Sequence, residues 1–233
     1  MSILAIAKRD LIAYFVSPLA YIIGASFLFI TGLFFFFNVA FKNSASLTPV
    51  FQAAGVALLF IIPGLTMHLF AREAGSGTLE LLLAAPVRPW EVVVGKFLAA
   101  FSFLGVLLAI TLAYVLLLLA YSQPDLPAAL SGYLGLLVLG AFLISLGVFA
   151  SALTTNQWLA AGLALVFSSF CWVIGGVSAL MQGRQVDLFT YLSGHTHFSP
   201  FTVGVITTNN LVYFLTFTLS ILLLTSHVVE LKR

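Results

Sequence analysis

One uncharged stretch decides the class of fold, and it is residues 97–124, FLAAFSFLGVLLAITLAYVLLLLAYSQP. The hydrocarbon core of a bilayer is about 30 Å thick, and about 20 apolar helical residues cross it. This stretch contains no Asp, Glu, Lys or Arg, and Pro124 followed by Asp125 is typical of a helix end. We therefore expect a membrane-spanning helix over about 97–122.

The composition of the whole chain agrees with a membrane environment. Of the 233 residues, 62% are hydrophobic and 7% are charged, and the mean hydropathy is +1.17. An ordinary soluble domain has about 25% charged residues. The net charge of +2 is not gathered into one patch, so it gives no indication of nucleic-acid binding. The single cysteine, Cys171, excludes an internal disulfide framework and a cysteine metal site within one chain. The composition predicts a polytopic membrane protein.

Charged residues are so rare that the gaps between them place the remaining spans. The gap of 58 residues from 126 to 183 is long enough for two helices, and its polar cluster at 154–157 predicts a tight turn between them. We expect an all-α membrane protein with a single domain over 1–233 and six spans, at about 18–41, 51–70, 97–122, 128–153, 158–181 and 205–228.

The N-terminal segment predicts an additional helix before the first span. Within residues 2–15, apolar side chains recur at helical spacing, with Ser2 and Arg9 on the other side: Ile3, Leu4, Ala7, Leu11, Ile12 and Phe15. This pattern is typical of a helix that lies in the membrane interface, and Pro18 suits the first turn of the span that follows. A plain extension of the first span is the alternative.

The distribution of Lys and Arg predicts the orientation of the chain. If the N-terminus is cytoplasmic, seven basic residues lie on the cytoplasmic side: Lys8, Arg9, Arg72, Arg88, Lys96, Lys232 and Arg233. Only Lys42 and Arg184 then lie on the opposite side. Basic residues are enriched in cytoplasmic loops. We therefore expect both termini in the cytoplasm, with one sizeable cytoplasmic loop over 71–96.

Two absences narrow the function. The predicted spans contain no charged residue, and their polar residues, such as Thr31, Asn38 and Ser145, are interpreted as packing groups, which disfavours a proton- or sodium-coupled carrier. A phosphate-binding loop requires Gly, four residues, Gly, Lys and then Ser or Thr. Here Gly95 and Lys96 are followed by Phe97. We expect no nucleotide site and no enzymatic activity in this chain, so any energy would come from a partner.

The cytoplasmic loop carries the most specific pattern. Ser76 to Thr78 can cap a short helix, whose apolar edge at i, i+3 and i+4 is formed by Leu79, Leu82 and Leu83 and which ends at Pro86. Pro89 then suits the first position of a helix that continues into the third span, and Glu91 suits its N-terminal end. A helix of two turns is marginal in water. We expect it to be held by docking against a partner; a re-entrant or interfacial leucine cluster without a partner is the alternative.

The same residues carry a resemblance to a known family. Arg72-Glu73, the run SGTLELLL at 76–83, Pro86-Val87 and GKFLA at 95–99 resemble the loop between the second and third helices of type-2 ABC exporter permeases. The C-terminal part resembles the branch with the gliding-motility-associated and nitrous-oxide-reductase-maturation permeases, through His197-Phe198, Gly204-Val205-Ile206, Tyr213-Phe214-Leu215 and Glu230. The chain departs from that branch with Val203 in place of an Arg, and with Thr207 to Asn210 in place of acidic residues.

The resemblance implies a permease subunit in the inner membrane that pairs with a second copy or a close relative and docks on two cytoplasmic ABC ATPases. ATP and Mg would be bound by those ATPases, and this chain would hold no cofactor or metal. The loop helix would be the coupling helix, and the transmission element would contain Glu73, Gly77, Thr78, Leu79, Glu80, Leu82, Leu83 and Pro86. Thr154 and Asn156 would form a second contact, and Lys96 would anchor the third span. Solvated charges at Glu73 and Glu80 and a snorkelling Lys96 are the alternatives.

Two further alternatives remain from the sequence. His195 and His197, with Asp187 nearby, are a weak metal pattern because no third ligand stands at a fixed spacing; short helices with His197-Phe198 packing are the favoured interpretation. As to function, the expected exporter has a rival in a mechanical transmitter that couples the ATPase to a periplasmic partner without moving a solute. A passive facilitator is a third possibility.

Overall fold

The computed structural model describes residues 3–42, 46–78, 88–122, 125–178 and 191–232. Within these ranges the chain is helical and contains no strand. The helices in chain order are α1 (Ile3–Val16), α2 (Pro18–Lys42), α3 (Thr48–Thr66), α4 (Ala71–Gly75), α6 (Pro89–Tyr121), α7 (Leu126–Leu153), α8 (Gln157–Ser178), α10 (Gly194–Thr202) and α11 (Thr208–Leu231).

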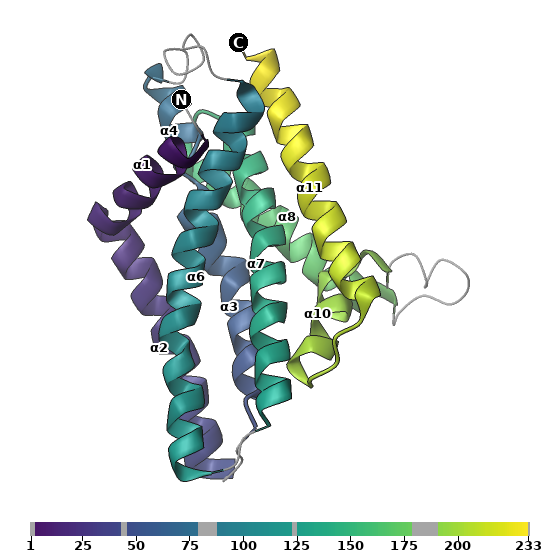
Figure 1. The fold of residues 1–233 in the computed structure, drawn as a ribbon. Helices are drawn as coiled ribbons and strands as arrows, with labels where there is room; N and C mark the ends of the chain where they lie inside the picture. The colour runs from purple at the N-terminus through teal and green to yellow at the C-terminus, as the bar shows by residue number, and fades with distance from the viewer. Residues whose placement is uncertain (1–2, 43–45, 79–87, 123–124, 179–190, 233) are drawn as a thin grey trace.

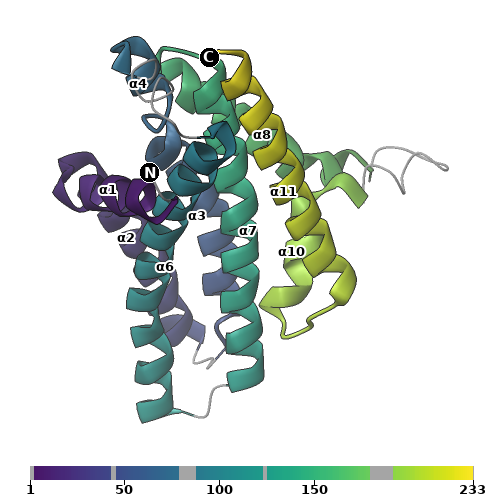
Figure 2. The ribbon, with the colours of Figure 1, turned by 45° about the horizontal axis from the view of Figure 1, so that its top comes forward.

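Six of the described helical segments are long and apolar enough to cross a membrane, which confirms the predicted all-α multi-pass fold. They run up and down the bundle, so that α4, the turn between α7 and α8, and both chain termini lie at one end (Figure 1). We call this the α4 end. Helices α2 and α6 end, and α3 and α7 begin, at the opposite end of the bundle (Figure 2). The short helix α10 packs between α7, α8 and α11.

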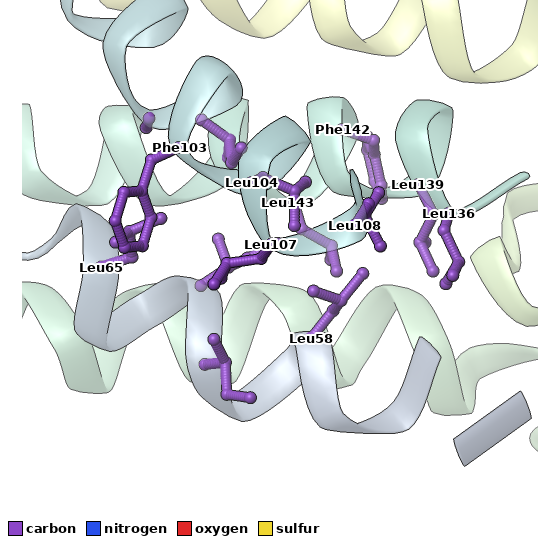
Figure 3. Packing of buried hydrophobic residues seen from close by; sticks show 14 of the residues in the cluster. Leu58, Leu65, Phe103, Leu104, Leu107, Leu108, Leu136, Leu139, Phe142 and Leu143 are labelled. Carbon is purple, nitrogen blue, oxygen red and sulfur yellow. The ribbon is translucent and has the colours of Figure 1, made fainter. Parts of the chain in front are cut away.

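The centre of the bundle consists of α3 and α7. In each of these two helices 72% of the most apolar window is buried, against 22–33% in the other four spans. Leucines and aromatic rings of α3, α6 and α7 interlock there, as Figure 3 shows for Leu58, Leu107, Leu139 and Phe142. Lipid is as apolar as these side chains, so close van der Waals packing, more than the hydrophobic effect, holds such helices together.

The N-terminal helix is separate from the first span, as predicted, but it uses another face. The chain breaks at Ser17, and α1 runs at a steep angle to α2 (Figure 1). The buried face of α1 consists of Ile6, Asp10 and Tyr14, which are spaced at i, i+4 and i+8 against α6. Three residues of the predicted apolar face have exposed side chains on the surface of the protein, namely Leu4, Ile12 and Phe15. The apolar spacing in the sequence therefore identified the face of α1 that points away from the bundle. A helix face in contact with lipid is apolar, just as a face in a protein core is.

The helix bounds near the α4 end add detail to two of the expected spans. Helix α3 ends at Thr66, and a turn at 67–70 leads into α4. The helix that was predicted to begin at Pro89 and to continue into the third span is α6, so Glu91 and Lys96 lie in the same helix as that span, before its uncharged part. Pro89 and Glu91 act as predicted, since Glu91 accepts a hydrogen bond from the backbone N–H of Arg88 at 2.9 Å.

Candidate functional site

Four charged side chains from three helices meet at the α4 end. Arg9 and Asp10 come from α1, Glu73 from α4 and Lys96 from α6. Lys96 Nζ lies 2.8 Å from Glu73 Oε2 and 3.3 Å from Asp10 Oδ2. On the other side, Arg9 Nε lies 2.7 Å from Asp10 Oδ1, and Arg9 Nη2 lies 2.9 Å from Glu73 Oε1. Each carboxylate therefore contacts both cations, and we call this arrangement the ion-pair cluster.

Burial makes the ion-pair cluster energetically important. Lys96 is 1% exposed, and its Nζ lies 5.1 Å from the centre of the Phe70 ring. Glu73 Oε2 accepts no hydrogen bond from the described part of the chain, so its ion pair with Lys96 compensates its charge. The hydrogen bond to Asp10 raises the pKa of the Arg9 guanidinium above its ordinary value. Removing one partner of a buried pair leaves an uncompensated charge, which costs about 3–5 kcal/mol.

The packing of α1 against α6 places Asp10 beside Lys96. Tyr14 is buried, donates a hydrogen bond to the carbonyl of Leu65 at 2.9 Å and stacks on Phe103. Gly95, next to Lys96, lets the helices approach closely, because a Cβ atom there would lie 2.9 Å from the side chain of Ile6 and 3.2 Å from the carbonyl oxygen of Ile3. The short distance between α1 and α6 therefore depends on a glycine.

Replacing Gly95 with Val is expected to push α1 away from α6 and to destabilise the protein. Forcing extra atoms into a packed interface costs about 1–3 kcal/mol. Gly105 on the same helix offers a matched control, because a Cβ atom there would meet nothing within 4 Å. Thermal unfolding in detergent, followed by the loss of the monodisperse peak on size exclusion, measures the difference. Equal melting temperatures for Gly95→Val and Gly105→Val would contradict the close contact.

The turn that carries α4 is fixed to α7 by one serine. Ser151 is fully buried, and its hydroxyl accepts hydrogen bonds from the backbone N–H groups of Phe70 and Ala71, both at 3.0 Å. The same hydroxyl donates to the carbonyl of Met67 at 3.0 Å. Ser151 thus satisfies backbone groups that the break between α3 and α4 leaves without helical partners.

The turn between α7 and α8 lies directly beside α4. A Cβ atom at Gly75 would lie 2.8 Å from the carbonyl oxygen of Thr155, so only glycine permits this approach. Thr154 accepts a hydrogen bond from the N–H of Asn156, and Asn156 Oδ1 accepts one from the N–H of Trp158, which caps the start of α8. Two segments that were predicted separately, the loop over 71–96 and the turn at 154–157, are thus neighbours in space.

Of the other residues of the predicted transmission element, some are described by the structure and some are not. Gly77 and Thr78 are exposed, and Gly77 has a φ of 73°, which favours glycine. Thr78 and Ser76 both donate to the carbonyl of Glu73, at 3.3 Å, and thus close the C-terminal end of α4. Residues 76–77 form a turn, and Thr78, the last residue described before the gap, is helical again, in agreement with a helix that begins here. The remaining residues lie outside the described ranges: Leu79, Glu80, Leu82, Leu83 and Pro86.

The alternatives for Glu73 and Lys96 are wrong, and two residues were missed. Lys96 does not snorkel toward water, because it is buried between two carboxylates, and Glu73 contacts two cations. Arg9 and Asp10 were not predicted as site residues. The sequence did contain a sign of this contact. Asp10 lies four residues after Ile6 and four before Tyr14, on one face of α1. If that face packs against another helix, the carboxylate is buried and needs a cation beside it.

The histidines near α10 take part in packing. His197 is buried, its Nδ1 lies 2.8 Å from Asn210 Oδ1, and its Nε2 lies 2.9 Å from the carbonyl oxygen of Tyr191. Phe198 is also buried, which confirms the predicted packing of this pair. No group of three potential metal ligands occurs among the residues that the structure describes, and Asp187 lies outside them.

Fold and site together define a multi-pass membrane subunit with charged groups concentrated at one end of an apolar bundle. A family model for the ABC-2 family transporter proteins matches residues 38–233. The chain belongs to this family, and it is therefore a permease subunit of an ABC transporter, which implies an ABC ATPase as its partner. No curated protein matches the chain.

Proposed function

We propose that this chain forms the membrane half of an exporter and moves a substrate out of the cytoplasm with ATP hydrolysed by separate subunits. Two ATPases would bind ATP and Mg, and this chain would pair with a second copy or a close relative. The segment 76–88 would contain the coupling helix, and the turn at 154–157 would be the second contact with the ATPase. The resemblance of the C-terminal part supports the further proposal that the chain is related to the gliding-motility and nitrous-oxide-reductase-maturation branch.

The ion-pair cluster is the observation that supports this proposal best. Glu73 lies in α4, before the segment 76–88, and Lys96 lies in α6, after it, so their ion pair joins the two helices that flank that segment. Arg9 and Asp10 connect the same point to α1. A push on the segment would therefore reach α1 and α6 directly. Buried charges at this position make sense as a rigid connection, because packed elements move as units.

The distribution of basic residues supports a cytoplasmic α4 end. Six described basic residues belong to segments at this end: Lys8, Arg9, Arg72, Arg88, Lys96 and Lys232. Lys42 ends α2 at the opposite end of the bundle, whereas Arg184 and Arg233 lie outside the described residues. Lys232 also donates a hydrogen bond to the carbonyl of Ala152 at 2.6 Å, which ties the C-terminal segment to the same corner. Under the positive-inside rule both termini are cytoplasmic.

Substituting Glu73 with Gln tests the proposed transmission. The variant loses two ion pairs but keeps the shape of the side chain, so ATPase binding is expected to persist while the permease-dependent part of ATP hydrolysis falls about fivefold, equivalent to about 1 kcal/mol. The measurement is ATP turnover by the complex in liposomes, relative to the ATPase alone. Glu230→Gln is the matched control, since Glu230 is an exposed glutamate at the same end.

Substrate movement is measured in the same liposomes. ATP-dependent loss of substrate from the medium of inside-out vesicles supports the exporter. Hydrolysis that responds to Glu73→Gln without movement of any solute would instead indicate a mechanical transmitter. Identical turnover in Glu73→Gln and Glu230→Gln would contradict transmission through the ion-pair cluster.

A further inference from the structure

The last turn of α7 is hydrogen-bonded to two other parts of the chain at the α4 end (Figure 1). The Ser151 hydroxyl binds the backbone of residues 67–71 through three hydrogen bonds, each at 3.0 Å. One residue further along α7, the carbonyl of Ala152 accepts the hydrogen bond from Lys232 Nζ at 2.6 Å. Two consecutive residues thus connect the end of α7 to the start of α4 and to the end of α11.

The bonds of Ser151 differ from those of Ser145, a serine on the same helix. Both serines are 0% exposed. The Ser145 hydroxyl donates to the carbonyl of Phe142 in its own helix at 2.7 Å, which is a common arrangement for a serine in a helix. The Ser151 hydroxyl instead bonds to backbone groups that lie 80 to 84 positions earlier in the chain. Its hydrogen bonds therefore place another segment of the protein against α7.

The turn at 154–157 begins three residues after Ser151, and the end of α7 determines where it lies. Among the described residues, the side-chain hydrogen bonds of this turn are local and involve the N–H groups of Asn156 and Trp158. They fix the shape of the turn but not its distance from α4. That distance depends on the end of α7 and on the close approach of Gly75 to the turn. Ser151, which binds the start of α4, is therefore in a position to control it.

Lys232 caps the same turn of α7 from α11. It follows the buried Val229 by three residues, so it lies on the face of α11 that packs against α7. The carbonyl groups in the last turn of a helix lack N–H partners within the helix and form the negative end of its dipole, which favours a cation. In the described part of the chain no carboxylate pairs with Lys232, and its ammonium group binds the Ala152 carbonyl. The end of α11 therefore stabilises the last turn of α7.

We propose that Ser151 is a positioning residue, assisted by Lys232, and that it holds the turn at 154–157 in a fixed place beside α4. The consequence for the ATPase rests on the proposed function, in which the segment 76–88 and this turn are the two contacts with the ATPase. Because packed elements move as units, the two contacts would then meet the ATPase as one rigid surface. The hydrogen bonds themselves can be tested without any ATPase.

The distance between two spin labels measures the position of the turn in the absence of the ATPase. The labels are attached through Arg72→Cys on α4 and Thr155→Cys in the turn, both at exposed positions, in a full chain that also carries Cys171→Ala. Pulsed electron paramagnetic resonance in nanodiscs should give one narrow distance distribution. In Ser151→Ala the backbone groups of residues 67–71 lose their partner, so the distribution is expected to become about twice as wide.

Further variants separate this effect from a general loss of structure. Ser145→Ala removes an equally buried hydroxyl from the same helix and should leave the distribution unchanged. Lys232→Met should widen the distribution even if Ser151→Ala does not fold, whereas Lys232→Arg keeps the cation and should not widen it. Lys8→Met removes an exposed lysine at the same end of the bundle and should have no effect. Size exclusion shows which variants are folded.

Cross-linking to the ATPase tests the consequence for the complex. Benzoylphenylalanine is placed at position 155 in one variant and at position 82 in another, in cells that also express the ATPase. In Ser151→Ala or Lys232→Met, the ratio of the adduct from position 155 to the adduct from position 82 is expected to fall about fivefold, equivalent to about 1 kcal/mol. A role in folding alone would lower both adducts together and leave their ratio unchanged.

The positioning role is wrong if Ser151→Ala and Ser145→Ala have the same distance distribution and Lys232→Met resembles Lys8→Met. It is also wrong if the adduct ratio stays constant, or if position 155 gives no adduct while position 82 does. Absence of an adduct from both positions would instead contradict the proposed contacts with the ATPase, and the spin-label distances would still report on the hydrogen bonds. Failure of the positioning role is therefore distinguishable from failure of the proposed function.

Discussion

Replacing Lys96 with Met is expected to lower the stability of the folded protein by about 3–5 kcal/mol, because Asp10 and Glu73 are then left without the buried cation between them. For a chain of this size, the melting temperature should fall by roughly 10 °C. Fluorescence-detected size exclusion after heating provides the measurement. The matched control is Lys8→Met, since Lys8 is an exposed lysine on α1, and its melting temperature should stay within about 2 °C of the parent.

A version of the ion-pair cluster that keeps only the charge of Arg9, whose side chain is 48% exposed, distinguishes charge from packing. Asp10→Asn, Glu73→Gln and Lys96→Met together remove the uncompensated charges, and much of the lost stability should return. If the triple variant is as unstable as Lys96→Met alone, loss of the lysine stem from its place over Phe70 would explain the effect, and the electrostatic account would be wrong.

Replacing Leu82 and Leu83 with Asp is expected to abolish association with the ATPase while leaving membrane insertion intact. The two leucines form the apolar edge of the predicted coupling helix, and a charge in an apolar interface costs several kcal/mol. A loss of about 3 kcal/mol weakens binding more than a hundredfold, so the ATPase should disappear from affinity-purified complexes. The measurement is the amount of ATPase recovered per permease after purification from co-expressing cells.

The control for the leucine pair is an aspartate at the other end of the bundle. Leu126 is 44% exposed and begins α7 next to Asp125, far from the α4 end (Figure 1). Leu126→Asp should leave the recovered ATPase unchanged. Full recovery of the ATPase with Leu82→Asp and Leu83→Asp would mean that this segment is not the docking element.

The sequence predicted the spans well because membrane helices are specified by long uncharged runs. The 28 residues of α7 and the 22 of α8 were separated correctly by a single polar turn at 154–157. The same logic did not reveal the environment of Lys96. The helix was correctly predicted to run from Pro89 into the third span, but the burial of Lys96 between the carboxylates of Asp10 and Glu73 was not expected.

The ion-pair cluster could only partly be inferred because its members are far apart in the chain. Glu73 was selected through the family resemblance, but its contact with Arg9 spans 64 positions and depends on how α1 folds back beside α4. Asp10 faces the bundle only because Gly95 lets α1 approach α6, a requirement that no local pattern expresses. The exposed side of α3, with Gln52 and Val56, could likewise not be predicted. The sequence pattern of a helix does not show which of its faces other helices leave uncovered.

Site-specific cross-linking measures whether the segment 76–88 meets the ATPase. A photoreactive benzoylphenylalanine at position 82, and separately at position 126, is introduced into the chain in cells that also express the ATPase. We expect an adduct with the mass of permease plus ATPase from position 82 and none from position 126. An adduct from position 126 but not from 82, or lipid adducts alone from position 82, would contradict a coupling segment that meets the ATPase at the α4 end.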